Sequence, residues 1–166
     1  IGNILIEINP WPFHNITFNP IPNSQPIDKN YHYNKTLLGQ QTGYRVINVF
    51  DWDDQDKIIS LLSNKTNIGA RKCELKEISI DDCDKFLNQH HLQNTCRKQL
   101  VRLGLYYQGK LVQVMTFGKP RYNKNYEWEL LRLCTKSSYN ITGGAEKLFG
   151  YFLNTYRPES IISYCD

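Results

Sequence analysis

The run Leu103-Gly104-Leu105-Tyr106-Tyr107-Gln108-Gly109-Lys110-Leu111-Val112-Gln113-Val114-Met115-Thr116-Phe117 organises the second part of this chain. Two segments rich in aliphatic and aromatic residues flank Gln108-Gly109. Two such segments joined by a two-residue turn that contains glycine predict a β-hairpin. The neighbouring elements are assigned outward from this antiparallel pair.

Strands and helices are expected on both sides of the hairpin. Residues 72–78 have the composition of a strand, and Ser79 with Asp81 and Asp82 predicts the start of a helix that continues to Leu87. Beyond the hairpin the expected order is a strand at 126–134, the Gly143-Gly144 pair, a helix with apolar residues at helical spacing, and a strand at 160–164.

The first part of the chain has the order strand, loop, helix, strand, helix. An apolar strand is expected at 4–8, a loop follows because five prolines lie between residues 10 and 26, and a helix is expected at 31–42 before Gly43. A buried strand is predicted at 44–50, and Asp51 or Asp53 is expected to cap a helix at 57–62. This order favours an α/β unit.

The polar run at 63–67, followed by Gly69, is the best candidate for a linker. It predicts two domains, at 1–66 and 67–166. The chain begins with Ile rather than Met on a strand-like run and ends on another strand-like run, so both domains are expected to be incomplete.

The composition excludes several classes of protein. The chain has 166 residues, 40% of them hydrophobic, and a net charge of +4. That composition argues against disorder. The chain also contains no run of about 18 apolar residues, which is the length that would span a bilayer. Residues 1–66 carry a net charge of −1 and residues 67–166 one of +5. A basic, tyrosine-rich part suits a polyanion such as nucleic acid, although a solvated surface explains the same charge.

The five cysteines, which are odd in number and widely spaced, do not predict a disulfide scaffold. A zinc site built from Cys73, Cys83, Cys96, His90 and His91 would lack the usual tight ligand spacing, which favours reduced thiols. Four Asn-x-Ser/Thr sequons occur in a chain that is rich in Asn throughout, and we interpret them as chance.

Five polar residues interrupt the pattern of the first part: Glu7, Asn9, His14, His32 and Lys35. Strand alternation places Glu7 opposite Ile6 and Ile8, so one interpretation is a solvent-facing carboxylate. The other is a phosphodiesterase site, in which a carboxylate binds a hard cation such as Mg²⁺ and histidine or lysine activates water or steadies the phosphate.

Three segments of the first part carry a resemblance to a known family. They are Ile4-Leu5-Ile6-Glu7-Ile8-Asn9-Pro10-Trp11-Pro12-Phe13-His14, Tyr31-His32-Tyr33-Asn34-Lys35-Thr36 and Gly43-Tyr44-Arg45-Val46-Ile47-Asn48-Val49-Phe50-Asp51. Together they resemble the core of very-short-patch-repair (Vsr)-like endonucleases, which include phage homing endonucleases. The resemblance covers about residues 3–62. It implies a restriction-endonuclease-like α/β core that cuts DNA with Mg²⁺. Within it, Glu7 matches the metal-binding carboxylate, His14 the histidine after the aromatic pair, and His32 with Lys35 the helix that borders the site. A further metal-binding aspartate is expected upstream of Ile1.

Basic residues in the second part cluster near expected strand ends, interleaved with tyrosines that could stack on bases. A charged hairpin end with packing tyrosines explains the same pattern. The candidate nucleic-acid-binding residues are Arg97, Lys98, Arg102, Lys119, Arg121, Tyr122 and Lys124. Glu129 and Arg132 share one expected strand with opposite charges, a pairing that is more often structural than catalytic.

The Thr142-Gly143-Gly144-Ala145 turn leads into a helix, where backbone N–H groups could bind a pyrophosphate; a simple tight turn is the alternative. Three segments around this turn carry a second resemblance. They are Met115-Thr116-Phe117-Gly118-Lys119-Pro120-Arg121-Tyr122, Trp128-Glu129-Leu130-Leu131-Arg132-Leu133-Cys134 and Gly143-Gly144-Ala145-Glu146-Lys147-Leu148-Phe149. Together with the turn they resemble a GNAT-type acyltransferase, of the Mom-like DNA-modification branch of phages. That resemblance covers about residues 71–166 and implies a mostly antiparallel central sheet and an acyl-CoA donor at Thr142, Gly143, Gly144 and Ala145.

The leading hypothesis is a phage-type DNA endonuclease joined to a GNAT-like domain that binds or modifies DNA. The alternatives are a base-modifying acyltransferase that uses an inactive nuclease domain as a DNA clamp, and a non-enzymatic nucleic-acid-binding module. The expected partner is DNA, with no membrane and no obligate protein partner, and the expected location is the cytoplasm of a bacterial host.

Overall fold

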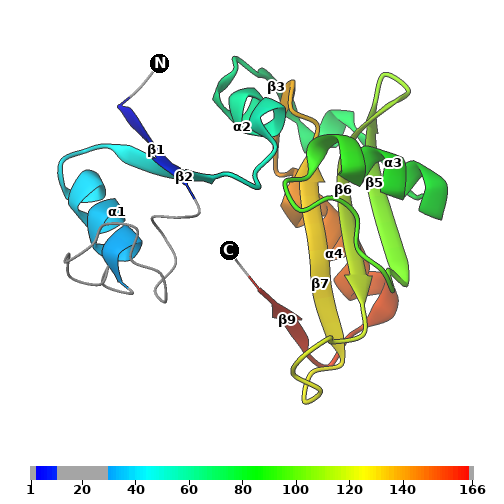
Figure 1. Cartoon of the computed structure of the whole chain (residues 1–166). Coiled ribbons are helices and arrows are strands. Elements are labelled where there is room, and N and C mark those ends of the chain that lie inside the picture. The colour runs from blue at the N-terminus through cyan, green and yellow to red at the C-terminus, as the bar shows by residue number, and fades with distance from the viewer. Residues whose placement is uncertain (1–2, 11–29, 165–166) are drawn as a thin grey trace. The chain divides into compact units, whose positions relative to one another are not determined.

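The computed structural model describes residues 3–10 and 30–164 of the chain, with the side chain of Leu61 excepted. The chain forms two compact units, Ile1–Ile58 and Ile59–Asp166. Both contain helices and strands, which confirms the mixed α/β class (Figure 1). No helix of the described residues has the length and the apolar composition that crossing a membrane requires.

The first unit pairs two parallel strands and packs one helix against them. These are β1 (Ile4–Asn9), α1 (Tyr31–Gln41) and β2 (Arg45–Phe50), and the strands run in register from Ile4 opposite Arg45 to Asn9 opposite Phe50. Gly43, with φ +82°, follows the last turn of α1 in the left-handed conformation that glycine adopts without strain. At Gly39 a Cβ would overlap Val46, so glycine lets α1 approach β2.

Helix α2 (Gln55–Leu62) begins two residues earlier than the sequence predicts, and its cap is a different aspartate. The Oδ1 atom of Asp54 accepts a hydrogen bond from the Lys57 N–H at 3.2 Å. Asp53 instead accepts one from the Phe50 N–H, which closes the turn after β2. The prediction of Asp51 or Asp53 as the cap is wrong because three acidic residues compete here, and the backbone path selects among them.

The second unit is built on a five-stranded sheet in the order β4-β5-β6-β7-β9. Its strands are β4 (Glu74–Glu77), β5 (Val101–Tyr107), β6 (Lys110–Gly118), β7 (Trp128–Thr135) and β9 (Ile161–Ser163). Neighbours are antiparallel except β9, which runs parallel to β7. The predicted hairpin is confirmed: Gln108 and Gly109 both have positive φ, at +49° and +72°, as its tightest turn type requires.

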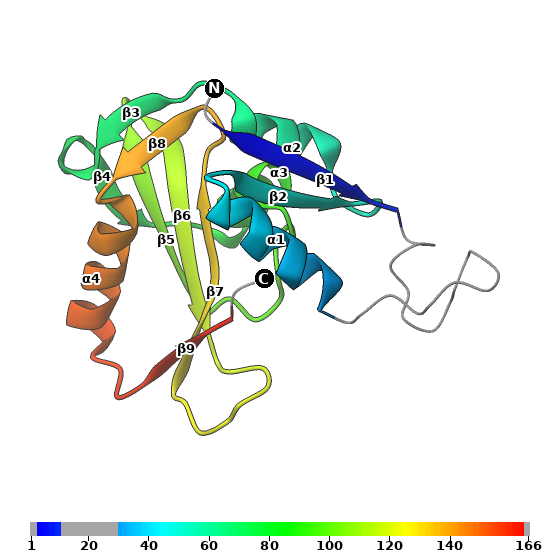
Figure 2. The same ribbon diagram turned by 90° about the vertical axis from the view of Figure 1, so that its left-hand side faces the viewer.

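Two helices cover opposite faces of this sheet (Figures 1 and 2). Helix α3 (Ile80–His90) begins at Ser79, whose side chain accepts a hydrogen bond from the Asp82 N–H, and it packs on a core that includes Phe86 and Leu87. Helix α4 (Gly144–Tyr156) covers the larger core, in which the rings of Phe117 and Phe152 stack with centroids 3.6 Å apart.

Two short elements depart from the sequence-based expectations. The polar residues at 63–67 are not all linker, since Thr66 and Asn67 begin β3 (Thr66–Gly69), which pairs in parallel with β8 (Tyr139–Thr142). A four-residue strand leaves little hydrophobic pattern in the sequence, so its long-range partner identifies it. The strand expected at 72–78 begins only at Glu74, because a single turn of 3₁₀ helix spans Ala70–Lys72.

Candidate functional site

Polar side chains line the face of the β1–β2 ribbon that packs against α1. Glu7 and Asn9 lie two residues apart on β1, so their side chains share one face, and Asn48 lies opposite Glu7 on β2. Asn9 is fully buried, and its amide nitrogen donates to Asn48 Oδ1 at 3.4 Å, while Asn48 donates to the Thr36 hydroxyl of α1 at 3.2 Å. This face therefore carries a network of amides and a carboxylate beside the apolar contacts of Leu5 and Val46 with α1.

Glu7 faces α1 rather than solvent. Its side chain is 11% exposed and forms an ion pair with Lys35 of α1, with 2.6 Å between Oε1 and Nζ. The apolar neighbours Ile6 and Ile8 are 48% and 72% exposed. The solvent-facing interpretation of Glu7 is wrong because strand alternation fixes which residues share a face but not which face the helix covers.

Lys35 keeps its positive charge in this pair. Its hydrogen bond to Glu7, together with the carboxylate charge, raises its pKa above the ordinary value for lysine. At neutral pH the ammonium is therefore protonated and cannot serve as a general base. It can attract and stabilise an anion.

Oxygen atoms beside this pair have no partner among the described residues. Glu7 Oε2 and Asn9 Oδ1 are buried and accept no hydrogen bond from any described group. Glu7 and Lys35 also line a hollow of about 310 Å³ between β1, β2 and α1. Carboxylate and amide oxygens are the ligands that hard cations such as Mg²⁺ prefer, so this donor set fits the expected metal.

The two histidines predicted for this site are His32 and His14. His32 lies on α1, one turn before Lys35 and Thr36, and its ring meets that of Phe50 edge-on, with centroids 6.0 Å apart. His14 lies outside the described residues. Within residues 3–10 and 30–164 no three His, Cys, Asp or Glu side chains are grouped as a metal site.

The glycine turn lies beside a hollow of about 560 Å³. Gly143 has φ +75° and precedes α4, whose first N–H groups have no partner within the helix. Arg71 adds a cation to the hollow and Glu146 an anion. Lys147 also lines it but donates to the carbonyl oxygens of Ala70 and Cys73, which ties α4 to the segment before β4.

Gly144 is required by packing rather than by its dihedral angles. A Cβ at this position would overlap the buried side-chain oxygen of Gln113 and the side chain of Ile141. Ala145 is half-buried against the core under α4, and Thr142 ends β8 with an exposed side chain. Of the four candidate donor-binding residues, Thr142 and Gly143 line the hollow.

An ion pair that the sequence did not reveal holds the loop between β6 and β7. Glu129 is fully buried, and Arg121 approaches its Oε1 with Nη2 at 2.6 Å and Nε at 2.7 Å. The backbone N–H of Arg121 donates to Oε2 at 2.6 Å. Glu129 was expected to face Arg132, but Arg132 donates to the carbonyl oxygens of Asn94 and Leu131 instead.

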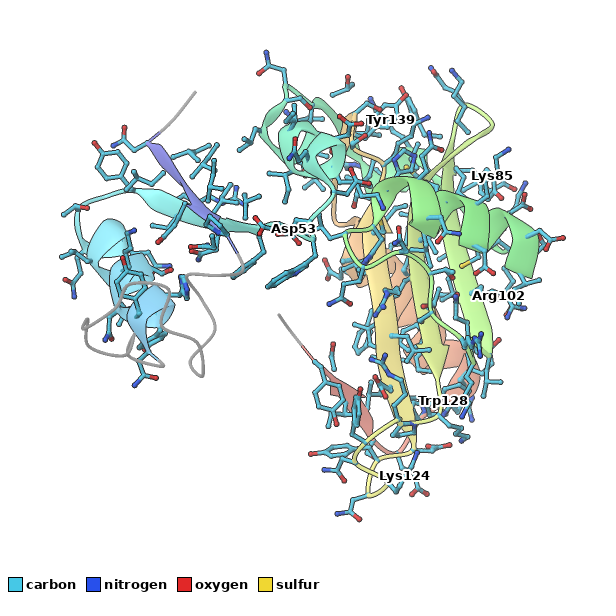
Figure 3. The ribbon with its side chains drawn as sticks, in the orientation of Figure 1. Asp53, Lys85, Arg102, Lys124, Trp128 and Tyr139 are labelled. Atoms are coloured by element: carbon cyan, nitrogen blue, oxygen red, sulfur yellow. The ribbon has the colours of Figure 1, made fainter. Side chains whose placement is uncertain are left out.

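The other basic residues divide into exposed and structural ones. Arg97 and Lys98 are exposed, and Lys98 lies close to Gly118, where the loop begins. Lys119 packs over the Trp128 ring, and Lys124, at the far end of the loop in Figure 3, donates to the Pro120 carbonyl.

Arg102 is structural in this fold. It lies on β5 opposite Thr116 of β6, and its guanidinium donates to the carbonyl oxygens of Ile78 and Gln99. These bonds join the end of β4 to the segment before β5. A role for Arg102 in DNA binding stays a prediction.

Comparison of the chain with models of protein families, with curated proteins and with solved structures finds no match in any of the three.

Proposed function

We propose that the protein is a metal-dependent DNA endonuclease, with its phosphodiester-cleaving site on the β1–β2 face. The observation that carries the proposal is the Glu7 carboxylate, which is 11% exposed, uses one oxygen for Lys35 and leaves the buried Oε2 without a described partner beside a hollow. A carboxylate next to a fixed cation suits hydrolysis of an anionic diester.

Each side chain has a separate role in this proposal. Glu7 Oε2 and Asn9 Oδ1 would hold Mg²⁺, which supplies Lewis-acid activation of the phosphate and of a water molecule. Lys35, kept protonated by Glu7, stabilises the negative charge that builds on the phosphate oxygens. His32, or His14, accepts the proton of the attacking water. The basic second unit supplies contacts to the DNA backbone.

The first experiment is nicking of supercoiled DNA by the full chain in Mg²⁺ and in EDTA. We expect cleavage only with the metal, and a loss of at least 100-fold in Glu7→Gln and in Lys35→Met, as for groups that act on the transition state. Glu74→Gln is the matched control, because Glu74 pairs with Lys76 at 2.9 Å on an exposed strand. Nicking by Glu7→Gln at the wild-type rate would overturn the assignment.

A second measurement tests the metal site without activity. Mn²⁺ added to the full chain should broaden the NMR signals of residues 5–9 first, and Glu7→Gln should remove that effect while Glu74→Gln keeps it. Broadening that is equal in both variants would remove Glu7 from the site.

A second candidate function is acyl transfer to DNA by the second unit. The hollow of about 560 Å³ beside Gly143 favours it, because Arg71 and the N-terminal turn of α4 can face a pyrophosphate there. Coenzyme A should then slow hydrogen exchange at residues 142–147, and Arg71→Ala should weaken that protection more than Lys72→Ala does. Unchanged exchange at saturating coenzyme A would exclude this function.

A further inference from the structure

A second hollow of the second unit lies where β7 and β9 stop pairing. The two strands are paired only from Trp128 opposite Ile161 to Leu130 opposite Ser163. Beyond that point they enclose a hollow of about 300 Å³, which the segment after α3 closes from one side. Its lining residues include Gln93, Leu131, Arg132, Leu133, Ser163 and Tyr164.

The lining has two kinds of surface. Leu131, Leu133 and the Tyr164 ring offer apolar walls, whereas Gln93 and Ser163 offer polar groups. Arg132 adds a positive charge in a fixed position, because Nε and Nη1 donate to two carbonyl oxygens at 3.1 and 2.8 Å. A nucleobase has the matching character, with flat apolar faces and a polar edge.

Two exposed tyrosines stand at the rim. Tyr122 is 76% exposed and Tyr164 47%, and their rings meet edge-on with centroids 5.8 Å apart. Arg121 lies 5.7 Å from the Tyr122 ring centroid. The buried Glu129 holds Arg121 through both its backbone and its side chain, so the loop presents Tyr122 from a fixed anchor. An exposed ring on an anchored loop can stack on a base at a smaller ordering cost than a ring on an unanchored loop.

Positive charge accompanies the tyrosines. Arg121 is held by Glu129 of β7, and Arg132 of the same strand donates to the carbonyl oxygen of Asn94, two residues before Cys96. Arg97 and Lys98 are exposed in the same segment as Cys96. A strand of nucleic acid could therefore follow these cations with its phosphates while one base reaches the rim.

We propose that this hollow and its tyrosine rim bind one unpaired base of a DNA strand. The proposal rests on the proposed function in taking DNA as the partner, and adds that the second unit selects single-stranded or locally unpaired DNA. A fully stacked duplex offers no free base face to the tyrosines and should bind more weakly.

The test is binding of the full chain, in EDTA so that no cleavage occurs, to an oligodeoxynucleotide that carries the fluorescent base 2-aminopurine. The single strand should bind at least tenfold more tightly than its duplex, with quenching of the fluorophore. Tyr122→Ala and Tyr164→Ala should each weaken binding about tenfold, the size of one base–aromatic stack. The matching Phe variants should retain it.

Tyr151→Ala is the control, because Tyr151 is also exposed but lies on α4. Equal binding of single strand and duplex would overturn the proposal, as would equal affinities of the Tyr122→Ala, Tyr164→Ala and Tyr151→Ala variants. Nicking in Mg²⁺ reports on Glu7 and Lys35, and binding in EDTA reports on Tyr122 and Tyr164, so a failed nuclease assay and a failed base-binding assay are separate results.

Discussion

The pair Arg121–Glu129 offers the sharpest test of how the second unit is held together. Arg121→Met leaves the carboxylate of Glu129, which is fully buried, without its counter-charge. Breaking a buried pair in this way costs about 3–5 kcal/mol, and we expect about 3 kcal/mol because the Arg121 side chain is 34% exposed and admits water. Glu129→Gln removes the charge and should cost about 1 kcal/mol.

The double variant should lose little more than Glu129→Gln, because a buried amide needs no cation. The expected coupling energy is then about 3 kcal/mol, at the upper end of the range for side chains in direct contact. The assay is urea unfolding of the full chain, followed through Trp128 after Trp11 and Trp52 are changed to Phe. With a slope of about 2 kcal/mol per molar urea, Arg121→Met should lower the midpoint by about 1.5 M.

The exposed pair Glu74–Lys76 supplies the comparison. Its side chains are 64% and 51% exposed, so Lys76→Met should change stability by less than about 0.5 kcal/mol. A coupling energy below about 0.5 kcal/mol between Arg121 and Glu129 would refute the argument that the loop is anchored by a buried charge.

Three further predictions concern stability. Gly144→Ala should destabilise the protein by about 1–3 kcal/mol, because the added methyl group overlaps buried side chains. Gly150→Ala, in open space on the same helix, should stabilise the protein by about 0.5–1 kcal/mol. Thermal unfolding of both variants measures the two changes. Ser79→Ala removes the cap of α3 and should cost about 1 kcal/mol in chemical unfolding. Burial and a hydrogen bond to Glu77 raise the pKa of Tyr156 to about 12, so its stabilising effect is complete below about pH 10, the ordinary pKa of tyrosine, and is lost as the pH rises toward 12. Unfolding at rising pH should show that loss in wild type, and a Tyr156→Phe variant that loses stability equally would contradict it.

Local signals explain the parts of the fold that the sequence predicted correctly. Gln108-Gly109 can adopt positive φ at both positions, and Ser79 can accept a hydrogen bond from the residue three positions on, so each acts within a few residues. The short strand β8 and the pairing of β3 with it depend on residues more than 70 positions apart. No local pattern contains that information.

The candidate site was predicted as a set of residues rather than as an arrangement. Glu7 and Lys35 were both singled out by their residue types, but their contact depends on α1 packing over β1, across 28 positions of chain. Asn9 and Asn48 were not singled out as ligands, because an amide after an apolar run has many uses. Only their mutual hydrogen bond in the folded protein marks them.

The sequence by itself determined the order of the longer strands and helices, the hairpin and the separation of an acidic first part from a basic second part. The tertiary structure decided which face of β1 is covered. It therefore placed the Glu7 carboxylate, which one interpretation of the sequence put in solvent, beneath α1 with its side chain 11% exposed. It also decided that Glu129 is paired with Arg121 rather than with its strand neighbour Arg132. The physical reason is the same in both cases: burial and charge pairing are set by the elements that pack together in space, whereas dihedral preferences and hydrophobic period act along the chain.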